Sequence, residues 1–253
     1  MIAGPVFGQR GRDDVQQSLD WATGIVVDGR LDDWGDSLQY THTGQQFDYH
    51  IKNDAEHVYV AIRVQDKDRQ MQVFAQGLAF MVNTQGKKRD GATVYYPVAD
   101  RLAFRSIMSA DNDDRPDDMR KGALEAIRAI YVMRFDDVLD GQISLENNYG
   151  IYAQAALDTA DALCVEMVVP LHRLGISVDD GDELAFNVKI NGIMIPGSGT
   201  SPRTMRRGYG GRYGYGYPYG YGYPYGGYGS DMPSKPREEP GVWVRAELAH
   251  KNE

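Results

Sequence analysis

Short segments in which apolar and polar residues alternate constrain this chain more than any other feature. The clearest is residues 57–64, where every second residue is Val or Ile. The same period of two recurs at residues 163–169, 184–190 and 242–248. Strands with this pattern bury one face and expose the other, as antiparallel sheets packed on a core do.

Turn-forming dipeptides separate these segments, among them Asp28-Gly29, Asn53-Asp54, Asp90-Gly91 and Asp180-Gly181. We expect further strands at residues 24–27, 47–52, 72–82, 92–97 and 151–156. Many short strands with such punctuation predict an all-β fold, here an antiparallel β-sandwich of Greek-key or jelly-roll type.

One short helix interrupts this pattern. Pro116 suits the first position of a helix, and the aspartates around it favour the positive end of the helix dipole. We expect the helix to end near Ile127 and a strand to follow at residues 129–135. A single helical turn is expected at residues 171–174, after Pro170.

Residues 208–229 differ in composition from the rest of the chain. Their 22 positions hold ten Gly and nine Tyr and no aliphatic side chain. We expect a long Gly/Tyr-rich loop within an insertion at residues 203–236, because the segment after it is too short to be a domain. Three interpretations stay open: an adhesive surface for glycans or proteins, an ordered cover on the sandwich or a partner, and an inert expansion.

We therefore expect one β-sandwich domain over residues 21–253, after a flexible N-terminus at residues 1–20. Val6 and Gly8 are small enough for the cleavage site of an export signal, so the first residues would be its remnant. A plain flexible terminus is the alternative. With the first interpretation, the protein is periplasmic or extracellular.

Charge and cysteine content exclude several classes of partner. The chain has 27 Lys and Arg against 36 Asp and Glu, a net charge of −9, which disfavours nucleic acid and anionic membranes. Its one cysteine, Cys164, forms no internal disulfide. No apolar run approaches the ~18 residues of a membrane span, so we expect none.

No catalytic motif is present, and the five histidines are not at metal-ligand spacing, so we expect a protein that is not an enzyme. Clustered carboxylates around the turn at Gly29 are candidate calcium ligands: Asp28, Asp32 and Asp33. The alternative is that they are solvated turn residues.

Aromatic side chains are the candidate ligand-binding residues, because exposed rings stack on sugars. Trp243 lies on the polar register of its strand, which predicts an exposed ring. The other candidates are Trp34, Tyr95 and, in the Gly/Tyr tract, Tyr217 and Tyr223.

Four motifs in order resemble carbohydrate-binding modules of family 9 and the wider DOMON-like sandwiches. Residues 25–34 are similar to the opening hydrophobic-Asp-Gly-x-Leu-x-x-Trp motif, and residues 53–66 to a turn followed by a Tyr-containing strand. Residues 166–174 resemble the Glu-x-x-hydrophobic-Pro-Leu motif, and residues 181–192 the Gly-Asp-x-hydrophobic-x-Phe-Asn strand. The resemblance implies an extracytoplasmic β-sandwich, with sugar binding between aromatic rings and structural calcium in some members.

These observations favour a non-catalytic, exported module that binds carbohydrate by aromatic stacking. One alternative is an assembly subunit of a cell-envelope complex, with the tyrosine-rich loop contacting the partner protein. The other alternative is haem-b binding, which the resemblance implies for related sandwiches, through Met194 with Lys189 or His172.

Overall fold

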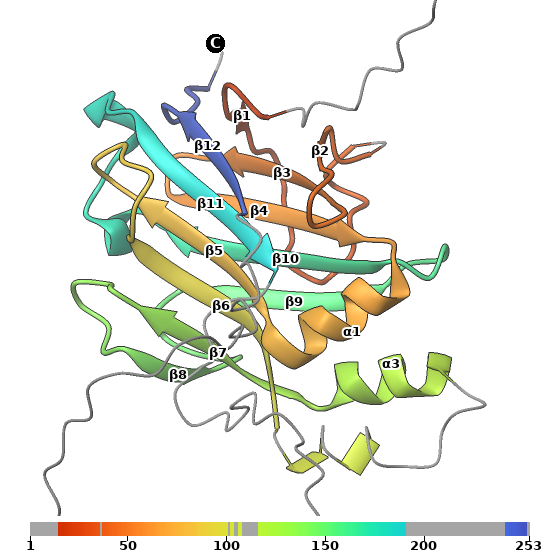
Figure 1. The fold of residues 1–253 in the computed structure, drawn as a ribbon. Helices are drawn as coiled ribbons and strands as arrows, with labels where there is room; N and C mark the ends of the chain where they lie inside the picture. Colours follow the sequence, from red (N-terminus) through yellow and green to blue (C-terminus); the bar gives the residue numbers. More distant parts are fainter. Residues whose placement is uncertain are drawn as a thin grey trace, which may run out of the picture.

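The protein is a sandwich of two six-stranded sheets (Figure 1). The computed structural model describes residues 15–35, 37–100, 102–103, 106–107, 116–190 and 241–251. The first sheet has the order β1-β3-β4-β10-β9, with β2 also paired to β3. The second has the order β12-β11-β5-β6-β7-β8. The predicted fold class is confirmed.

The first sheet consists of β1 (Asp20–Trp21), β2 (Tyr40–His42), β3 (Phe47–Asn53), β4 (His57–Val64), β9 (Tyr152–Leu157) and β10 (Leu163–Pro170). The second consists of β5 (Leu78–Asn83), β6 (Ala92–Ala99), β7 (Ile127–Met133), β8 (Gly141–Ser144), β11 (Leu184–Ile190) and β12 (Val242–Ala246). All pairings are antiparallel except that of β1 with β3, which is parallel.

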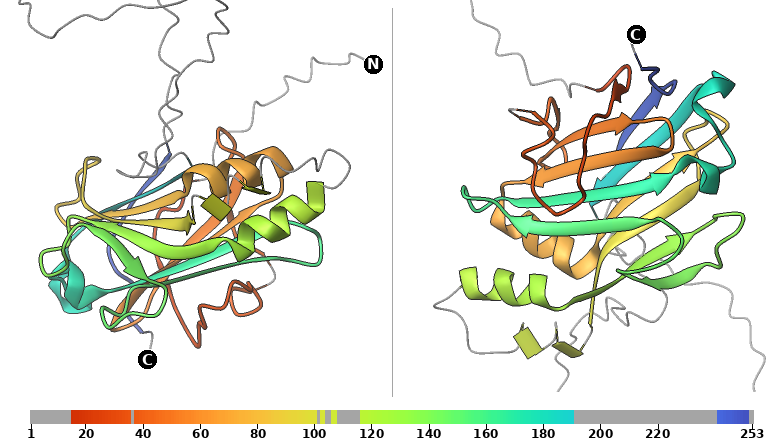
Figure 2. Two further views of the ribbon diagram at one scale, coloured as in Figure 1. Left: turned by 90° about the horizontal axis from the view of Figure 1, so that it is seen from below. Right: turned by 180° about the vertical axis from the view of Figure 1, so that it is seen from behind.

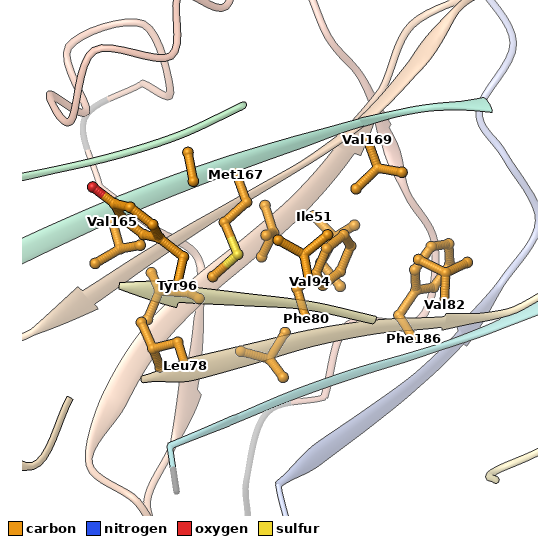
Figure 3. Packing of buried hydrophobic residues seen from close by; sticks show 14 of the residues in the cluster. Ile51, Leu78, Phe80, Val82, Val94, Tyr96, Val165, Met167, Val169 and Phe186 are labelled. Atoms are coloured by element: carbon orange, nitrogen blue, oxygen red, sulfur yellow. The ribbon is translucent and has the colours of Figure 1, made fainter. Parts of the chain in front are cut away.

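The alternating apolar residues form the core between the sheets (Figure 3). Val165 and Met167 of β10 face side chains of the second sheet, including Leu78 and Tyr96. The Phe80 and Phe186 rings stack with their centroids 6.2 Å apart. Burying each such side chain contributes about 1.5–3 kcal/mol, so the period of two is the main source of stability.

Helix α1 (Lys67–Gln76) closes one end of the sandwich, where a strand at residues 72–82 was expected. Asp66 caps its N-terminus by accepting from the Arg69 N–H, and its buried Val73 and Phe74 belong to the core. The strand β5 begins only after Gly77, whose φ is +78°. The expected strand was wrong in its first half, because the helical i, i+3, i+4 spacing of the buried residues Gln70, Val73 and Phe74 was not recognised.

Helix α3 (Pro116–Glu125) begins at the expected proline and leads into β7 at Ile127. Its Arg120 is buried and reaches across to the loop between β9 and β10. The Nη2 atom donates to Asp161 Oδ2 at 2.6 Å and Nη1 donates to Gln70 Oε1 of α1 at 2.9 Å. This contact holds α1, α3 and the first sheet together at one end.

Residues 22–38 pass over the outer face of the first sheet, and 24–27 are not the expected strand. The described chain begins at Val15, within the terminus expected at residues 1–20. Gln16 is buried, and its amide exchanges two hydrogen bonds with the backbone of Ile51. The remainder of the expected flexible terminus, residues 1–14, lies outside the described residues.

Strands β11 and β12 pair directly, with Val188 opposite Val242. In the sequence, 51 residues (191–241) lie between these two strands. Figure 2 shows α1 and α3 at one end of the sandwich. The opposite end carries the β5–β6 turn, the β7–β8 turn and the expected helical turn η1 (Leu171–Leu174), followed by η2 (Val178–Asp180). Within the described residues, no helix combines the length and hydrophobicity of a membrane span.

Candidate functional site

Two of the sequence motifs meet at the buried carboxylate of Glu166, on the outer face of β10. Its Oε2 accepts from the backbone N–H groups of Asp28 at 3.0 Å and Gly29 at 2.7 Å. Its Oε1 accepts from the Trp34 indole Nε1 at 2.7 Å. Burial raises the pKa of Glu166, while these three donors act in the opposite direction.

This arrangement assigns a structural role to the opening motif. Gly29 has a φ of +83°, and a Cβ there would lie 2.8 Å from the Ala155 carbonyl carbon, so the turn must contain glycine to approach β9. Trp34 is 3% exposed and packs with Tyr59, Ala61 and Val168. The ring therefore offers no free face to a sugar.

The three candidate calcium ligands have separate partners. Asp28 Oδ1 accepts from the Arg30 N–H, and Asp32 pairs with the Arg30 guanidinium at 2.6 Å. Asp33 Oδ2 accepts from the Val26 N–H at 2.6 Å. In the described part of the chain, no group of three or more His, Cys, Asp or Glu is arranged to hold a metal ion.

The aromatic candidates on the second sheet lie on its outer face. Trp243 is half-buried on the edge strand β12, opposite Asn187, so its register is as expected. Tyr95 is buried, with its ring 6.1 Å from that of Tyr131. Tyr217 and Tyr223 lie outside the described residues.

Of the candidate haem ligands, the structure places His172 and Lys189, the two alternative partners of Met194. His172 lies exposed in η1, whereas Lys189 lies in β11 at the α1 end of the sandwich. Met194 lies outside the described residues.

Burial raises the pKa of the Cys164 thiol to about 12, so this cysteine stays protonated and is a poor nucleophile.

A polar hollow of about 250 Å³ lies at the end of the sandwich opposite α1. The β5–β6 turn, the segment after β7 and η1 contribute side chains to it, including Asn83, Arg89, Asp90, Arg134, Asp136 and Arg173. Its volume is slightly below the usual range for small-molecule sites, about 300–1,000 Å³, so it would hold part of a ligand such as one sugar ring. None of these residues was a candidate from the sequence.

Backbone geometry brings the walls of this hollow together. Arg134 has a φ of +61°, which turns the chain after β7, and its Nη2 lies 2.8 Å from Asp90 Oδ2. A Cβ on Gly91 would lie 2.1 Å from the Val82 carbonyl oxygen, so only glycine fits there. Non-glycine residues with positive φ cost free energy and often occur at ligand sites.

An exposed aromatic ring lies beside the hollow. Tyr149 is 37% exposed, and the Arg173 guanidinium carbon lies 5.7 Å from the centre of its ring. Arg173 Nε also donates to the Tyr149 carbonyl oxygen at 3.1 Å. Asn147 holds this loop in place by accepting from the Tyr149 N–H and donating to the Ile151 carbonyl.

Sequence reasoning did not find this site because its residues come from separate turns. The usable signals were the basic run Lys87-Lys88-Arg89 and the loop Asn147–Tyr152, which holds two tyrosines. Tyr152, in β9, is 44% exposed, and its hydroxyl donates to the Asn147 carbonyl at 3.3 Å. The periodicity that predicts strands contains no information on which turns share one end.

Comparisons with known proteins give similarity in structure alone. A scan with protein-family models found no match, and neither did a comparison of the sequence with curated proteins. A carbohydrate-binding module of family 9 from Caldicellulosiruptor kristjanssonii, in complex with glucose, is similar with 13% identity and a TM-score of 0.34. The match covers 68% of this chain and 76% of that one.

The second structure is a "putative carbohydrate-binding protein" from Bacteroides uniformis, with 11% identity and a TM-score of 0.35. The match covers 70% of this chain and 83% of that one. Family 9 is also the family that the four sequence motifs resemble. At these identities no residue is carried over from either structure, and the site is built from the side chains of this chain.

Proposed function

We propose that the protein is a non-catalytic, extracytoplasmic module that binds carbohydrate at the hollow beside Tyr149. The observation that carries this proposal is the combination of an exposed ring with polar groups that both donate and accept. Tyr149 supplies an aromatic surface, and the adjacent hollow contains guanidinium, carboxylate and amide groups. Sugars have the same mixture of apolar C–H faces and hydroxyl groups.

The hydrogen-bonding chemistry of the hollow suits hydroxyl groups. Each hydroxyl donates one proton and accepts through two lone pairs, so it pairs with an arginine on one side and an aspartate on the other. Arg134 and Asp90 provide such a pair 2.8 Å apart. Both side chains remain partly exposed, 40% and 70%, and are accessible to a ligand.

The proposal is tested with a glycan array followed by calorimetric titration of the best glycan. We expect saturable binding by the full chain and a clear loss of affinity in Arg134→Ala. Arg30→Ala is the matched control, because Arg30 is an exposed arginine paired with an aspartate on the outer face of the first sheet. Absence of binding to every glycan, or equal affinity of Arg134→Ala and the wild type, contradicts the proposal.

A further inference from the structure

The β5–β6 turn carries three consecutive cations that form no ion pair with another described residue. Lys87, Lys88 and Arg89 follow one another in this turn, and Arg89 lines the hollow. Among the described residues, none of the three forms an ion pair. Arg89 Nη2 and Lys87 Nζ both donate to Gln85 Oε1, at 2.5 Å and 3.4 Å, and that amide oxygen is neutral.

The other two arginines of the hollow are already paired. Arg134 lies against Asp90, and Arg173 forms an ion pair with Asp137. Among the described residues, Arg89 and its two lysine neighbours therefore have no ion pair, and neither has Asp136 of the lining. Glu183 is a neighbouring carboxylate, with its Oε2 3.4 Å from the Cβ position of Gly86, but it is already paired with Arg245. Lys87, Lys88 and Arg89 therefore form a basic rim beside the hollow, on a chain whose net charge is −9.

We propose that the ligand is an acidic glycan, in which an anionic oxygen group on a sugar ring binds Arg89 and its neighbouring lysines. This inference rests on the proposed function and specifies its ligand class. The planar guanidinium forms two parallel hydrogen bonds with carboxylate or sulfate oxygens, and the lysines add positive potential. A wholly acidic surface repels such a ligand, so a local basic rim is what permits its approach.

A sugar fits this rim better than an anionic membrane does. Arg89 lines a hollow that also contains Asp136, a carboxylate that can accept from sugar hydroxyls. The exposed ring of Tyr149 lies against Arg173, which lines the same hollow. A flat, charged lipid surface uses neither the hollow nor the carboxylates that line it.

The test compares acidic oligosaccharides with neutral counterparts that have the same rings. The panel holds uronate oligosaccharides with their methyl esters, and sulfated oligosaccharides with their unsulfated forms. The full-length protein is titrated with each at 50 mM and 500 mM NaCl. We expect acidic forms to bind at least ten-fold more tightly than their neutral counterparts at low salt, with most of that difference lost at high salt.

The variant K87Q/K88Q/R89Q removes the rim charge, and we expect it to bind the acidic form about ten-fold more weakly. Its affinity for a neutral glycan should change little. K88Q, which removes one rim charge, is compared with Lys121→Gln in α3 at the opposite end, which removes one charge far from the hollow and should leave the affinity unchanged. The carboxylate and sulfate arms then identify which anion the rim selects.

Three results overturn the inference. Equal affinity for acidic and neutral forms refutes the ligand class while leaving carbohydrate binding intact. Binding to phosphatidylglycerol vesicles with no binding to acidic glycans identifies a membrane surface instead. Absence of binding to any glycan, acidic or neutral, refutes the proposed function together with this inference.

Discussion

The Trp34 indole donates to Glu166 Oε1 at 2.7 Å, and this contact joins the first sequence motif to the third. The carboxylate is wholly buried, so it is stable only because three N–H groups surround it. The motif residues therefore attach the segment 22–38 to the outer face of the first sheet. These hydrogen bonds stabilise the fold, and the proposed ligand site lies at the end of the sandwich that carries the hollow.

Removing the indole donor should destabilise the protein. Trp34→Phe keeps an aromatic ring but leaves one oxygen of Glu166 without its donor, which we expect to lower the free energy of unfolding by about 1.5–3 kcal/mol. Urea unfolding followed by circular dichroism measures the change. Trp243→Phe is the matched control, because the Trp243 indole forms no hydrogen bond among the described residues. A similar loss in both variants would show that ring size, not the hydrogen bond, matters.

The stability of the protein should depend on pH through the buried side chain of His50. This side chain is buried, its Nε2 lies 2.7 Å from Asp20 Oδ2, and burial is the main cause that lowers its pKa below 6.5. A histidine whose pKa is lower in the folded state binds protons preferentially when unfolded. It therefore stabilises the fold above pH 6.5, and this stability is lost as the pH falls through the folded pKa.

Melting temperatures of the wild type and His50→Gln from pH 8 to pH 5 test this expectation. The wild type should lose more stability below about pH 6.5 than the variant, which has no titrating group at this position. His250→Gln, at an exposed histidine, should retain the wild-type profile. Parallel profiles for the wild type and His50→Gln would contradict the assignment.

The stability of the end of the sandwich that carries α1 should depend on Arg120. Arg120→Ala removes the buried donor of Gln70 and Asp161, and we expect the free energy of unfolding to fall by about 2–4 kcal/mol. This figure is below that of a fully buried ion pair, because the Asp161 side chain is 43% exposed. Arg120→Lys keeps the positive charge but cannot donate to Gln70 and Asp161 in the geometry of the guanidinium. We expect its stability to lie between that of the wild type and that of Arg120→Ala. Chemical denaturation with hydrogen exchange in α3 measures both. Wild-type stability in Arg120→Ala would refute this role.

The ring beside the hollow should affect binding without affecting folding. Tyr149→Ala removes the exposed stacking surface, so we expect a 3- to 10-fold weaker affinity for the glycan identified by the array and an almost unchanged melting temperature. Tyr149→Phe keeps the ring and should retain most of the affinity. Titration calorimetry measures both variants. If Tyr149→Phe loses as much as Tyr149→Ala, the hydroxyl group and not the ring is responsible.

The Gly/Tyr insertion should be dispensable for the sandwich. Replacing residues 203–236 with a short Gly/Ser linker leaves β11 and β12 to pair as before, because each halving of loop length changes the closure free energy by only about 0.6 kcal/mol. Thermal melting should therefore change little. Loss of cooperative unfolding would mean that the tract contributes to the core.

The sequence predicts the core of this protein better than its ends. Buried strands such as β4 and β10 repeat apolar residues every two positions, and nothing nearby competes with that pattern. Helix α1 was missed because its short apolar stripe, Val73 and Phe74, continues into the apolar β5. The parallel pairing of β1 with β3 involves two residues, too few to produce any period.

The hollow could not be predicted for a different reason. Its arginines lie at positions 89, 134 and 173, and each belongs to a different turn. Only the topology brings these turns to one end, and topology follows from strand order, which the sequence pattern leaves open. The rings selected from the sequence, Trp34 and Tyr95, are buried for the same reason that made them conspicuous: large aromatic residues fill cores.

Helix α1 and the Arg120 contact seal one end of the sandwich, while the hollow lies at the other. The buried contacts of Arg120 and the proposed binding site therefore lie at opposite ends of the same domain. Substitutions in the turns of the proposed site need not weaken the contacts at the α1 end, and stabilising substitutions at the α1 end need not change affinity at the proposed site. Such a division makes this scaffold a favourable starting point for directed evolution of new specificities.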